Sequence, residues 1–230
     1  MARNMFCPVC GASAINHYAA NKPVADFYCN DCKSDYELKS KQSNIVHISP
    51  KIADGAYGTM IERITSQRNP HLFIMTHANW AVKNLMMIPN FFFVPDIIEK
   101  RPPLKDTARR AGWIGCNINI GDIPESGKIF IIRNGRQEDK SKVVALYQRA
   151  LSLHTDKMGS RGWLMDILKC LERIPQDVFC LDEVYAFAGE LQRKHPENSF
   201  VRDKIRQQLQ FLRDKGFIKF IARGHYQKIR

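Results

Sequence analysis

The sequence has 230 residues, of which 44% are hydrophobic and 25% charged, so it is a globular chain and not a disordered one. The formal net charge of +12 favours a polyanionic partner such as nucleic acid, although a basic composition alone does not require one. No apolar run approaches the ~20 residues that cross a bilayer and no signal peptide precedes the first cysteines, so we expect a cytoplasmic protein without a membrane partner.

Four of the seven cysteines form two Cys-x-x-Cys pairs near the start of the chain. An odd total with four residues in paired spacing favours a zinc site in a reducing compartment over a disulfide framework. Redox-active pairs are the alternative. A zinc ion held by four thiolates has no open position for substrate, so its role here would be structural. The predicted zinc ligands are Cys7, Cys10, Cys29 and Cys32.

Two short strands are predicted around the second cysteine pair. Residues 24–28 form an apolar run that contains Asp26, and residues 36–39 alternate between apolar and charged side chains. Period-two alternation places Glu37 and Lys39 on one face of the second strand. A hairpin through the cysteine pair would therefore return Asp26 to the side of Glu37.

This arrangement suits metal-dependent phosphodiester hydrolysis. The carboxylates of Asp26 and Glu37 can hold Mg²⁺ together with substrate phosphate oxygens, and Lys39 can orient a water molecule and stabilise developing negative charge. The pattern by itself is weak. The alternative is an ordinary strand with a solvated charged face and Leu38 buried on the other face.

The middle of the chain predicts a mixed α/β domain with helices flanking a sheet. A helix is expected over residues 52–66, strands over 72–75, 84–88 and 128–133, and a second helix over 140–151. An Asn-Gly pair after the last strand predicts a tight turn.

A basic aromatic segment lies between these elements. Arg109 and Arg110 are adjacent, and Trp113 follows between two glycines. The two arginines can contact a phosphate backbone while the indole stacks on an extruded base. The alternative is a buried tryptophan next to two surface arginines.

A second domain is predicted after a polar linker at residues 152–162. Helices are expected over 163–174 and 181–194, and Asn198 is expected to cap a third. Paired strands over 217–229 complete a winged helix-turn-helix. The boundaries that we expect are residues 1–155 for the catalytic domain and residues 156–230 for the winged-helix domain.

The third helix of this second domain is strongly amphipathic and basic. From Ser199 to the end there are nine basic and two acidic residues, which places +7 of the net charge of +12 here. Arginine and glutamine have the donor geometry to read base edges in the major groove. A winged helix that contacts proteins is the alternative. The predicted DNA-binding residues of this helix are Arg202, Arg206, Gln207, Gln210 and Arg213.

The motifs together resemble the DpnI-type methyl-directed (Type IIM) restriction endonucleases of the PD-(D/E)xK superfamily. The resemblance covers nearly the whole chain and includes the two cysteine pairs, the region of Asp26 and Glu37, and the basic aromatic segment. The segments that carry it are Cys7–Gly11, Asn16–His17, Pro23–Cys32, Glu37–Lys41, Asp54–Tyr57, Thr107–Ile118, Ser160–Trp163 and Lys204–Gln210.

The resemblance implies a prokaryotic, cytoplasmic, Mg²⁺-dependent nuclease that cuts double-stranded DNA at GATC sites containing 6-methyladenine, and we expect it to act as a monomer without an obligate protein partner. It implies Asp26, Glu37 and Lys39 as the catalytic set, and Trp113 as part of a methyl-base pocket in the catalytic domain. The winged helix would be a second methyl-dependent reader. One departure from the family is visible: the sequence begins almost at Cys7 without the N-terminal helical extension associated with the family. Ala25 also precedes Asp26 where the superfamily pattern has proline, but the resemblance to the family includes that difference. If such an N-terminal extension supports the sheet in the family, stability or partner contacts would differ here.

Two other functions fit parts of the sequence. A zinc-ribbon and winged-helix transcription regulator would use the same DNA-binding features without catalysis. A nuclease of the His-Asn-His type can also be built around a zinc knuckle, but no adjacent histidine pair follows the knuckle in this chain.

Overall fold

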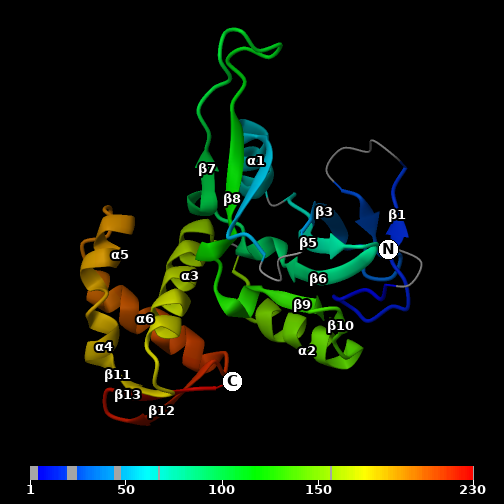
Figure 1. Cartoon of the computed structure of the whole chain (residues 1–230). Coiled ribbons are helices and arrows are strands. Elements are labelled where there is room, and N and C mark those ends of the chain that lie inside the picture. Colours follow the sequence, from blue (N-terminus) through cyan, green and yellow to red (C-terminus); the bar gives the residue numbers. More distant parts are fainter. Residues whose placement is uncertain (1–4, 20–24, 44–47, 67, 156, 230) are drawn as a thin grey trace. The chain divides into compact units, whose positions relative to one another are not determined.

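The computed structural model describes residues 5–19, 25–43, 48–66, 68–155 and 157–229 (Figure 1). Val24, at the start of the first expected strand, lies outside the described residues. The chain divides into two compact units, Met1–His154 and Thr155–Arg230, which we call the N-terminal unit and the C-terminal unit.

The main sheet of the N-terminal unit contains seven strands in the described part of the chain, in the order β1-β2-β3-β5-β6-β9-β10. All neighbouring pairs are antiparallel except β3 and β5, which are parallel. The strands are β1 (Asn16–His17), β2 (Phe27–Tyr28), β3 (Asp35–Gln42), β5 (His71–Ala78), β6 (Ala81–Ile88), β9 (Ile129–Arg133) and β10 (Arg136–Gln137).

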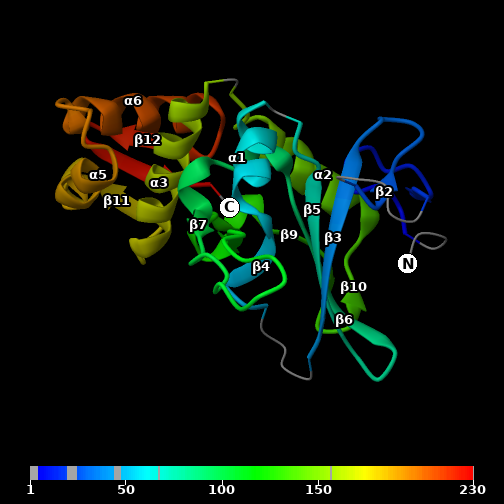
Figure 2. The ribbon, with the colours of Figure 1, turned by 90° about the horizontal axis from the view of Figure 1, so that it is seen from above.

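The parallel pair of β3 and β5 fixes the position of the candidate catalytic residues. Parallel neighbours need a crossover connection, and the chain between them supplies β4 (Lys51–Ala56) and α1 (Tyr57–Thr65). The two strands run side by side (Figure 2). Glu37 lies opposite Leu72, and Lys39 lies opposite Ile74. The Glu37–Lys39 segment is therefore anchored to the interior of the sheet.

A second sheet has the order β4-β8-β7, with β7 (Ile98–Lys100) and β8 (Gly115–Asn119). The helix expected over residues 52–66 is wrong in its first part, because Lys51–Ala56 is a strand and the helix begins at Tyr57. Pairing with β8 satisfies the backbone of β4, and Gly55 disfavours a helix at this point.

The core of the N-terminal unit lies between the main sheet and α2 (Lys140–Leu151), which packs against β9 (Figure 1). Tyr147 of α2 meets the ring of His71 edge-on at a centroid distance of 5.7 Å. Phe91 and Phe92 are buried in a short 3-10 helix, Asn90–Phe92, that follows β6. Other short 3-10 helices span Pro95–Ile97, Ile120–Asp122 and Glu125–Gly127. The Asn134–Gly135 pair has positive φ at both residues and forms the turn expected between β9 and β10.

The C-terminal unit combines four helices in its described residues with a three-stranded sheet in the order β11-β13-β12. A basic helix followed by a paired-strand wing is the arrangement that the sequence predicted. The elements are α3 (Met158–Arg173), β11 (Val178–Cys180), α4 (Leu181–Tyr185), α5 (Ala188–Lys194), α6 (Val201–Asp214), β12 (Ile218–Ala222) and β13 (His225–Lys228).

Three local expectations in this unit are wrong. The linker predicted over residues 152–162 is shorter, because α3 begins at Met158. The helix expected over residues 181–194 is divided into α4 and α5. Asn198 does not cap α6: its side chain accepts a hydrogen bond from the Phe200 amide at 2.8 Å, one residue before the helix begins.

Among the helices that the structure describes, none is both long enough and apolar enough to pass through a membrane.

Candidate active site and nucleic-acid interface

Strand β3 places Glu37 and Lys39 on one face of the main sheet. Lys39 Nζ lies 2.7 Å from Glu37 Oε1, and the two side chains are 27% and 16% exposed. Tyr36, on the opposite face, is fully buried. Leu38 is only half-buried, less than the alternation predicted. The charged pair therefore occupies a partly enclosed position, unlike the solvated row of the alternative interpretation.

Asp26 lies across the β2–β3 hairpin from this pair, as expected. Its backbone amide donates to the Tyr36 carbonyl at 2.9 Å, and its Oδ2 accepts a hydrogen bond from the Leu38 amide at 2.7 Å. The Asp26 carboxylate thus accepts a backbone hydrogen bond from β3 at the position just before β2 begins. It is exposed at the edge of the charged face.

Two residues that the sequence did not identify complete this charged face. Asp54, from β4, places Oδ1 2.5 Å from Lys39 Nζ, and the Asp54 side chain is only 6% exposed. Arg63, from α1, donates to Glu37 Oε2 at 2.7 Å and to Asn69 Oδ1 at 2.9 Å. We call Glu37, Lys39, Asp54 and Arg63 the charged cluster. It balances two carboxylates against two cations.

The charged cluster keeps Lys39 protonated. Burial alone lowers the pKa of the Lys39 ammonium, but the hydrogen bonds to Asp54 and Glu37 prevail and hold that pKa above its ordinary value. A protonated lysine in this position acts as a donor to an anion or a water molecule and not as a base.

The four predicted zinc ligands converge in the structure. Their sulfur atoms all lie within 4.8 Å of one another, with Cys7 Sγ 3.6 Å from Cys32 Sγ and Cys10 Sγ 3.7 Å from Cys29 Sγ. A tetrahedral zinc ion with Zn–S bonds of ~2.3 Å separates its sulfurs by about 3.8 Å. The spacing of these thiols fits such an ion.

Tyr36 connects the cysteine cluster to the charged cluster. Its hydroxyl lies 3.0 Å from Cys7 Sγ, and its ring stacks on Phe73 at a centroid distance of 4.6 Å. Tyr36 directly precedes Glu37 in β3. The cysteine cluster is therefore tied through one buried side chain to the strand that carries Glu37 and Lys39.

No second metal centre of comparable convergence exists in the described ranges. The cysteine quartet is the group of three or more Cys, His, Asp or Glu side chains there that converges on one point. Asp26 and Asp54 do not form such a group with Glu37. The oxygens of Glu37 are instead engaged by Lys39 and Arg63.

The basic aromatic segment lies in the arm that joins β7 to β8, residues 101–114, visible as a long hairpin-like extension in Figure 1. Arg109 and Arg110 are exposed near its turn. Trp113 is half-buried, with the Arg101 guanidinium 5.8 Å from the centre of its ring. Trp113 is therefore not buried in the core, whereas the alternative of a buried tryptophan next to two surface arginines requires it to be.

Helix α6 presents the amphipathic pattern that the sequence predicted. Its buried face consists of Val201, Ile205, Gln208, Leu209 and Leu212. The five residues that the sequence selected are all exposed on the other face: Arg202, Arg206, Gln207, Gln210 and Arg213.

Tyr185 of α4 organises part of this exposed face. The Arg206 Nε donates to the Tyr185 hydroxyl, and the Arg202 guanidinium lies 5.1 Å from the centre of the same ring. Both guanidinium groups are therefore positioned by the same aromatic ring.

Two family models match the chain. The model described as DpnI, the Dam-replacing family, matches residues 1–156, and the model described as the Dam-replacing HTH domain matches residues 159–228. The chain belongs to the DpnI family. Membership confirms the resemblance seen in the motifs, and it supports a site-specific endonuclease with DNA as its partner. The mixed α/β fold, the helix-turn-helix domain and the cysteine cluster are as predicted.

The sequence contained one indication that Asp54 matters for function. The segment Asp54–Tyr57 is among those that carry the resemblance, but the expected helix gave its acidic residue no partner. Arg63 had no comparable signal. The adjacent acid, Glu62, does not join the charged cluster: its side chain is 71% exposed and paired with Arg68.

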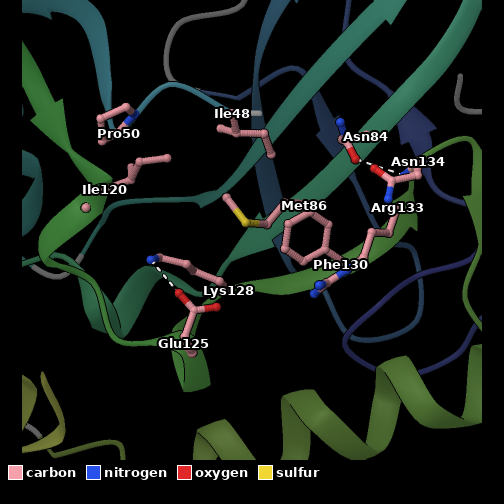
Figure 3. A pocket seen from close by; sticks show the side chains of 11 residues that line it. Ile48, Pro50, Asn84, Met86, Ile120, Glu125, Lys128, Phe130, Arg133 and Asn134 are labelled. Carbon is pink, nitrogen blue, oxygen red and sulfur yellow. Dashed lines mark hydrogen bonds and ion pairs between the residues drawn. The ribbon is translucent and has the colours of Figure 1, made fainter. Parts of the chain in front are cut away.

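A groove of about 820 Å³ runs beside the charged cluster between β3, β5 and β4, and Lys39 and Lys41 are among its lining residues. A separate pocket of about 350 Å³ lies over β6 and β9, where Met86 and Phe130 form an apolar floor and Lys128 pairs with Glu125 at 2.8 Å (Figure 3). None of the predicted site residues lines this second pocket. Of the predicted catalytic residues, Lys39 lines the groove beside β3.

Proposed function

We propose that this protein is a methyl-directed restriction endonuclease that hydrolyses double-stranded DNA at GATC sites containing 6-methyladenine, with Mg²⁺ as cofactor, and that it acts as a monomer. The observation that carries the proposal is the partly enclosed pair of Glu37 and Lys39 on an interior strand of a DpnI family chain. A regulator that only binds DNA has no use for such a pair, because desolvating charges without a function lowers stability.

The reaction needs a water molecule to attack phosphorus while the bond to the leaving oxygen breaks and that oxygen gains a proton. Lys39 is protonated and directed along the charged face, so it orients the water and balances the charge that develops on the phosphoryl oxygens. Asp26 accepts a hydrogen bond from the amide of Leu38, the residue that follows Glu37 in β3, so we propose that both carboxylates serve the same metal ion.

Their oxygen donors suit Mg²⁺, which binds through one or two carboxylates and completes its shell with water and phosphate oxygens. When bound, the ion would polarise the phosphoryl group and lower the pKa of a coordinated water. Glu37 would exchange a contact with Lys39 or Arg63 for the ion, while Asp26 is already exposed on this face.

Methyl recognition requires more than a single apolar contact. Burying one methyl group contributes only about 1 kcal/mol, which separates methylated from unmethylated sites about fivefold. Two readers in the same chain strengthen that discrimination. We propose Arg109, Arg110 and Trp113 as the reader of the N-terminal unit and the exposed face of α6 as the reader of the C-terminal unit.

Cleavage of plasmid DNA tests the proposal. Incubated with Mg²⁺, the protein is expected to cut a plasmid methylated on the adenine of GATC and to leave the same plasmid intact when it lacks that methylation. Fragment ends are expected to map to GATC, and EDTA is expected to prevent cutting.

Each failure has a distinct meaning. Equal cutting of both plasmids contradicts methyl dependence. Cutting of neither, with DNA binding retained, contradicts the endonuclease and leaves a DNA-binding regulator.

Replacing Arg206 by alanine is expected to weaken DNA binding and to reduce the slope of log affinity against log salt by about 1, because one cationic contact to the DNA is lost. In the free protein the Arg206 side chain is 58% exposed and its nearest acid, Asp203, lies 3.7 Å away. Binding is measured by fluorescence anisotropy of a labelled duplex at several salt concentrations.

Lys169→Ala is the matched control. Lys169 is a basic residue of the same unit, but it lies on α3 and pairs with Glu172 at 3.2 Å. The control changes the net charge equally and is expected to leave the salt slope unchanged. Equal slopes for the wild-type protein and Arg206→Ala would contradict a DNA-facing α6.

A further inference from the structure

We propose that Asp54 is a positioning residue of the active site, whose carboxylate holds the Lys39 ammonium at the reacting phosphate. This inference rests on the proposed endonuclease function and adds a residue to its site. Asp54 Oδ1 lies 2.5 Å from Lys39 Nζ, and the other acidic contact of that nitrogen is Glu37 Oε1 at 2.7 Å.

Burial makes the Asp54 contact more than a surface ion pair. The Asp54 side chain is 6% exposed, so its carboxylate has lost most of its hydration and depends on Lys39 for compensation. Exposed ion pairs elsewhere in the same unit differ in this respect. Lys51 and Glu99, which join β4 to β7, have side chains that are 54% and 36% exposed.

The backbone of β4 holds Asp54 in place independently of β3. Asp54 lies opposite Cys116 in the ladder between β4 and β8, and the ladder is irregular just after it, between Asp54 and Ala56. A side chain on a paired strand is a firmer support than one on a loop. Asp54 therefore connects the small sheet to the catalytic strand at the point where Lys39 must be fixed.

The charge balance of the cluster explains why a second acid is needed. Glu37 is shared between Lys39 and Arg63, and the proposed reaction requires Glu37 to turn toward a metal ion. Lys39 then loses part of its contact with Glu37. Asp54 remains as a counter-charge that keeps the ammonium on the charged face and prevents it from swinging into solvent.

The test is a double-mutant cycle on cleavage, with Asp54→Asn, Lys39→Ala and the double variant. Asp54→Asn is expected to lower the single-turnover rate on a methylated duplex about 10- to 100-fold, the usual range for a residue that supports a reacting group. The affinity of Asp54→Asn for the duplex in EDTA is expected to stay within about twofold of the wild-type affinity, since the variant and the wild-type protein have the same binding surface.

The double variant is expected to be no slower than Lys39→Ala alone, because Asp54 acts through Lys39. If the rate of the double variant falls by the product of the two single-variant factors, the proposal is overturned and Asp54 has a role independent of Lys39. Glu62→Gln, which removes an exposed acid from the neighbouring helix α1, is the control and is expected to leave the rate unchanged.

The same cycle in urea separates this inference from the proposed function. If Asp54 holds Lys39, the loss in unfolding midpoint of the double variant is smaller than the sum of the two single losses. Additive losses would overturn the inference even if the wild-type protein cuts methylated DNA. A wild-type protein that cuts neither plasmid would contradict the endonuclease, and the unfolding cycle would still decide whether Asp54 holds Lys39.

Discussion

Replacing Glu37 by glutamine is expected to lower cleavage of methylated DNA by about 10³-fold or more, because the amide cannot replace the charge that the metal ion and the transition state require. Glutamine keeps the shape of the side chain and can still accept a hydrogen bond from Arg63, which now bonds Glu37 Oε2 at 2.7 Å. Single-turnover cleavage of a methylated duplex measures the loss.

Binding should change in the opposite direction. Removing one negative charge from a face that receives phosphates is expected to leave affinity in EDTA equal to that of the wild-type protein or higher. Loss of cleavage together with undiminished binding is the signature of a group that acts on the reacting phosphate. Glu62→Gln on α1 again serves as the control for removing one acid, and cleavage by Glu37→Gln at the wild-type rate would exclude this site.

Replacing Cys29 by serine is expected to abolish zinc binding and destabilise the N-terminal unit by about 5 kcal/mol or more, since structural zinc contributes much of the folding free energy in small zinc-bound modules. Cys29 is completely buried, so a smaller polar side chain there also removes packing. The measurements are zinc content by atomic absorption and the urea midpoint. Cleavage is expected to be lost with the metal.

The reason for the loss of cleavage is specific to this fold. Cys29 and Cys32 lie between Asp26 and Glu37 in the chain, and Tyr36 contacts both the cysteine cluster and the sheet. Without the cluster, the hairpin no longer holds Asp26 beside β3. On this proposal, zinc would govern cleavage by holding the hairpin and would not contact DNA.

Cys180→Ser provides the matched control for this experiment. Cys180 is a partly exposed thiol of the C-terminal unit, outside the cysteine cluster. The control is expected to retain zinc and wild-type cleavage. Full cleavage by zinc-free protein would contradict the connection between the cysteine cluster and the active site.

The features that sequence reasoning predicted are those set by short-range chemistry. The two Cys-x-x-Cys pairs require only a local turn each, and the four sulfurs converge as their spacing indicates. Alternation in β3 placed Glu37 and Lys39 together, and the apolar spacing of α6 identified its buried face. In the strand and the helix, neighbours within a few residues determine the geometry, whereas the two cysteine pairs meet across 25 residues, between Cys7 and Cys32.

The charged cluster was only half predictable, because its other members come from contacts distant in sequence. Asp54 reaches Lys39 only because β4 pairs with β8, some sixty residues later in the chain. A local reading of residues 52–66 favours a helix, in which Asp54 would have no such partner. Arg63 is one of several charged residues on α1, and nothing in its immediate sequence marks it as the partner of Glu37.

The start of the C-terminal unit shows a different limit of prediction from sequence, namely prediction from composition. Residues 152–162 are polar and contain glycine, which is typical of a linker. In the structure Arg161 and Gly162 are buried in α3. Polar composition predicts that a segment is exposed to solvent, but it does not show which other parts of the fold pack against that segment.

The pairing of β4 with β8 has a consequence for synthesis of the chain: we expect the charged cluster to be completed late. The residues of the hairpin and the charged cluster lie between Asp26 and Arg63, yet β4 is an edge strand whose neighbour in the sheet, Gly115–Asn119, is made much later. Pairing across that separation must wait for the intervening chain and for the closure of a long loop. A ribosome-bound fragment that ends before Gly115 would carry every proposed catalytic side chain without the strand that holds Asp54 against Lys39. The growing chain would therefore remain a poor nuclease until this part of the fold is complete, which limits untargeted cutting before the DNA-reading unit has been synthesised.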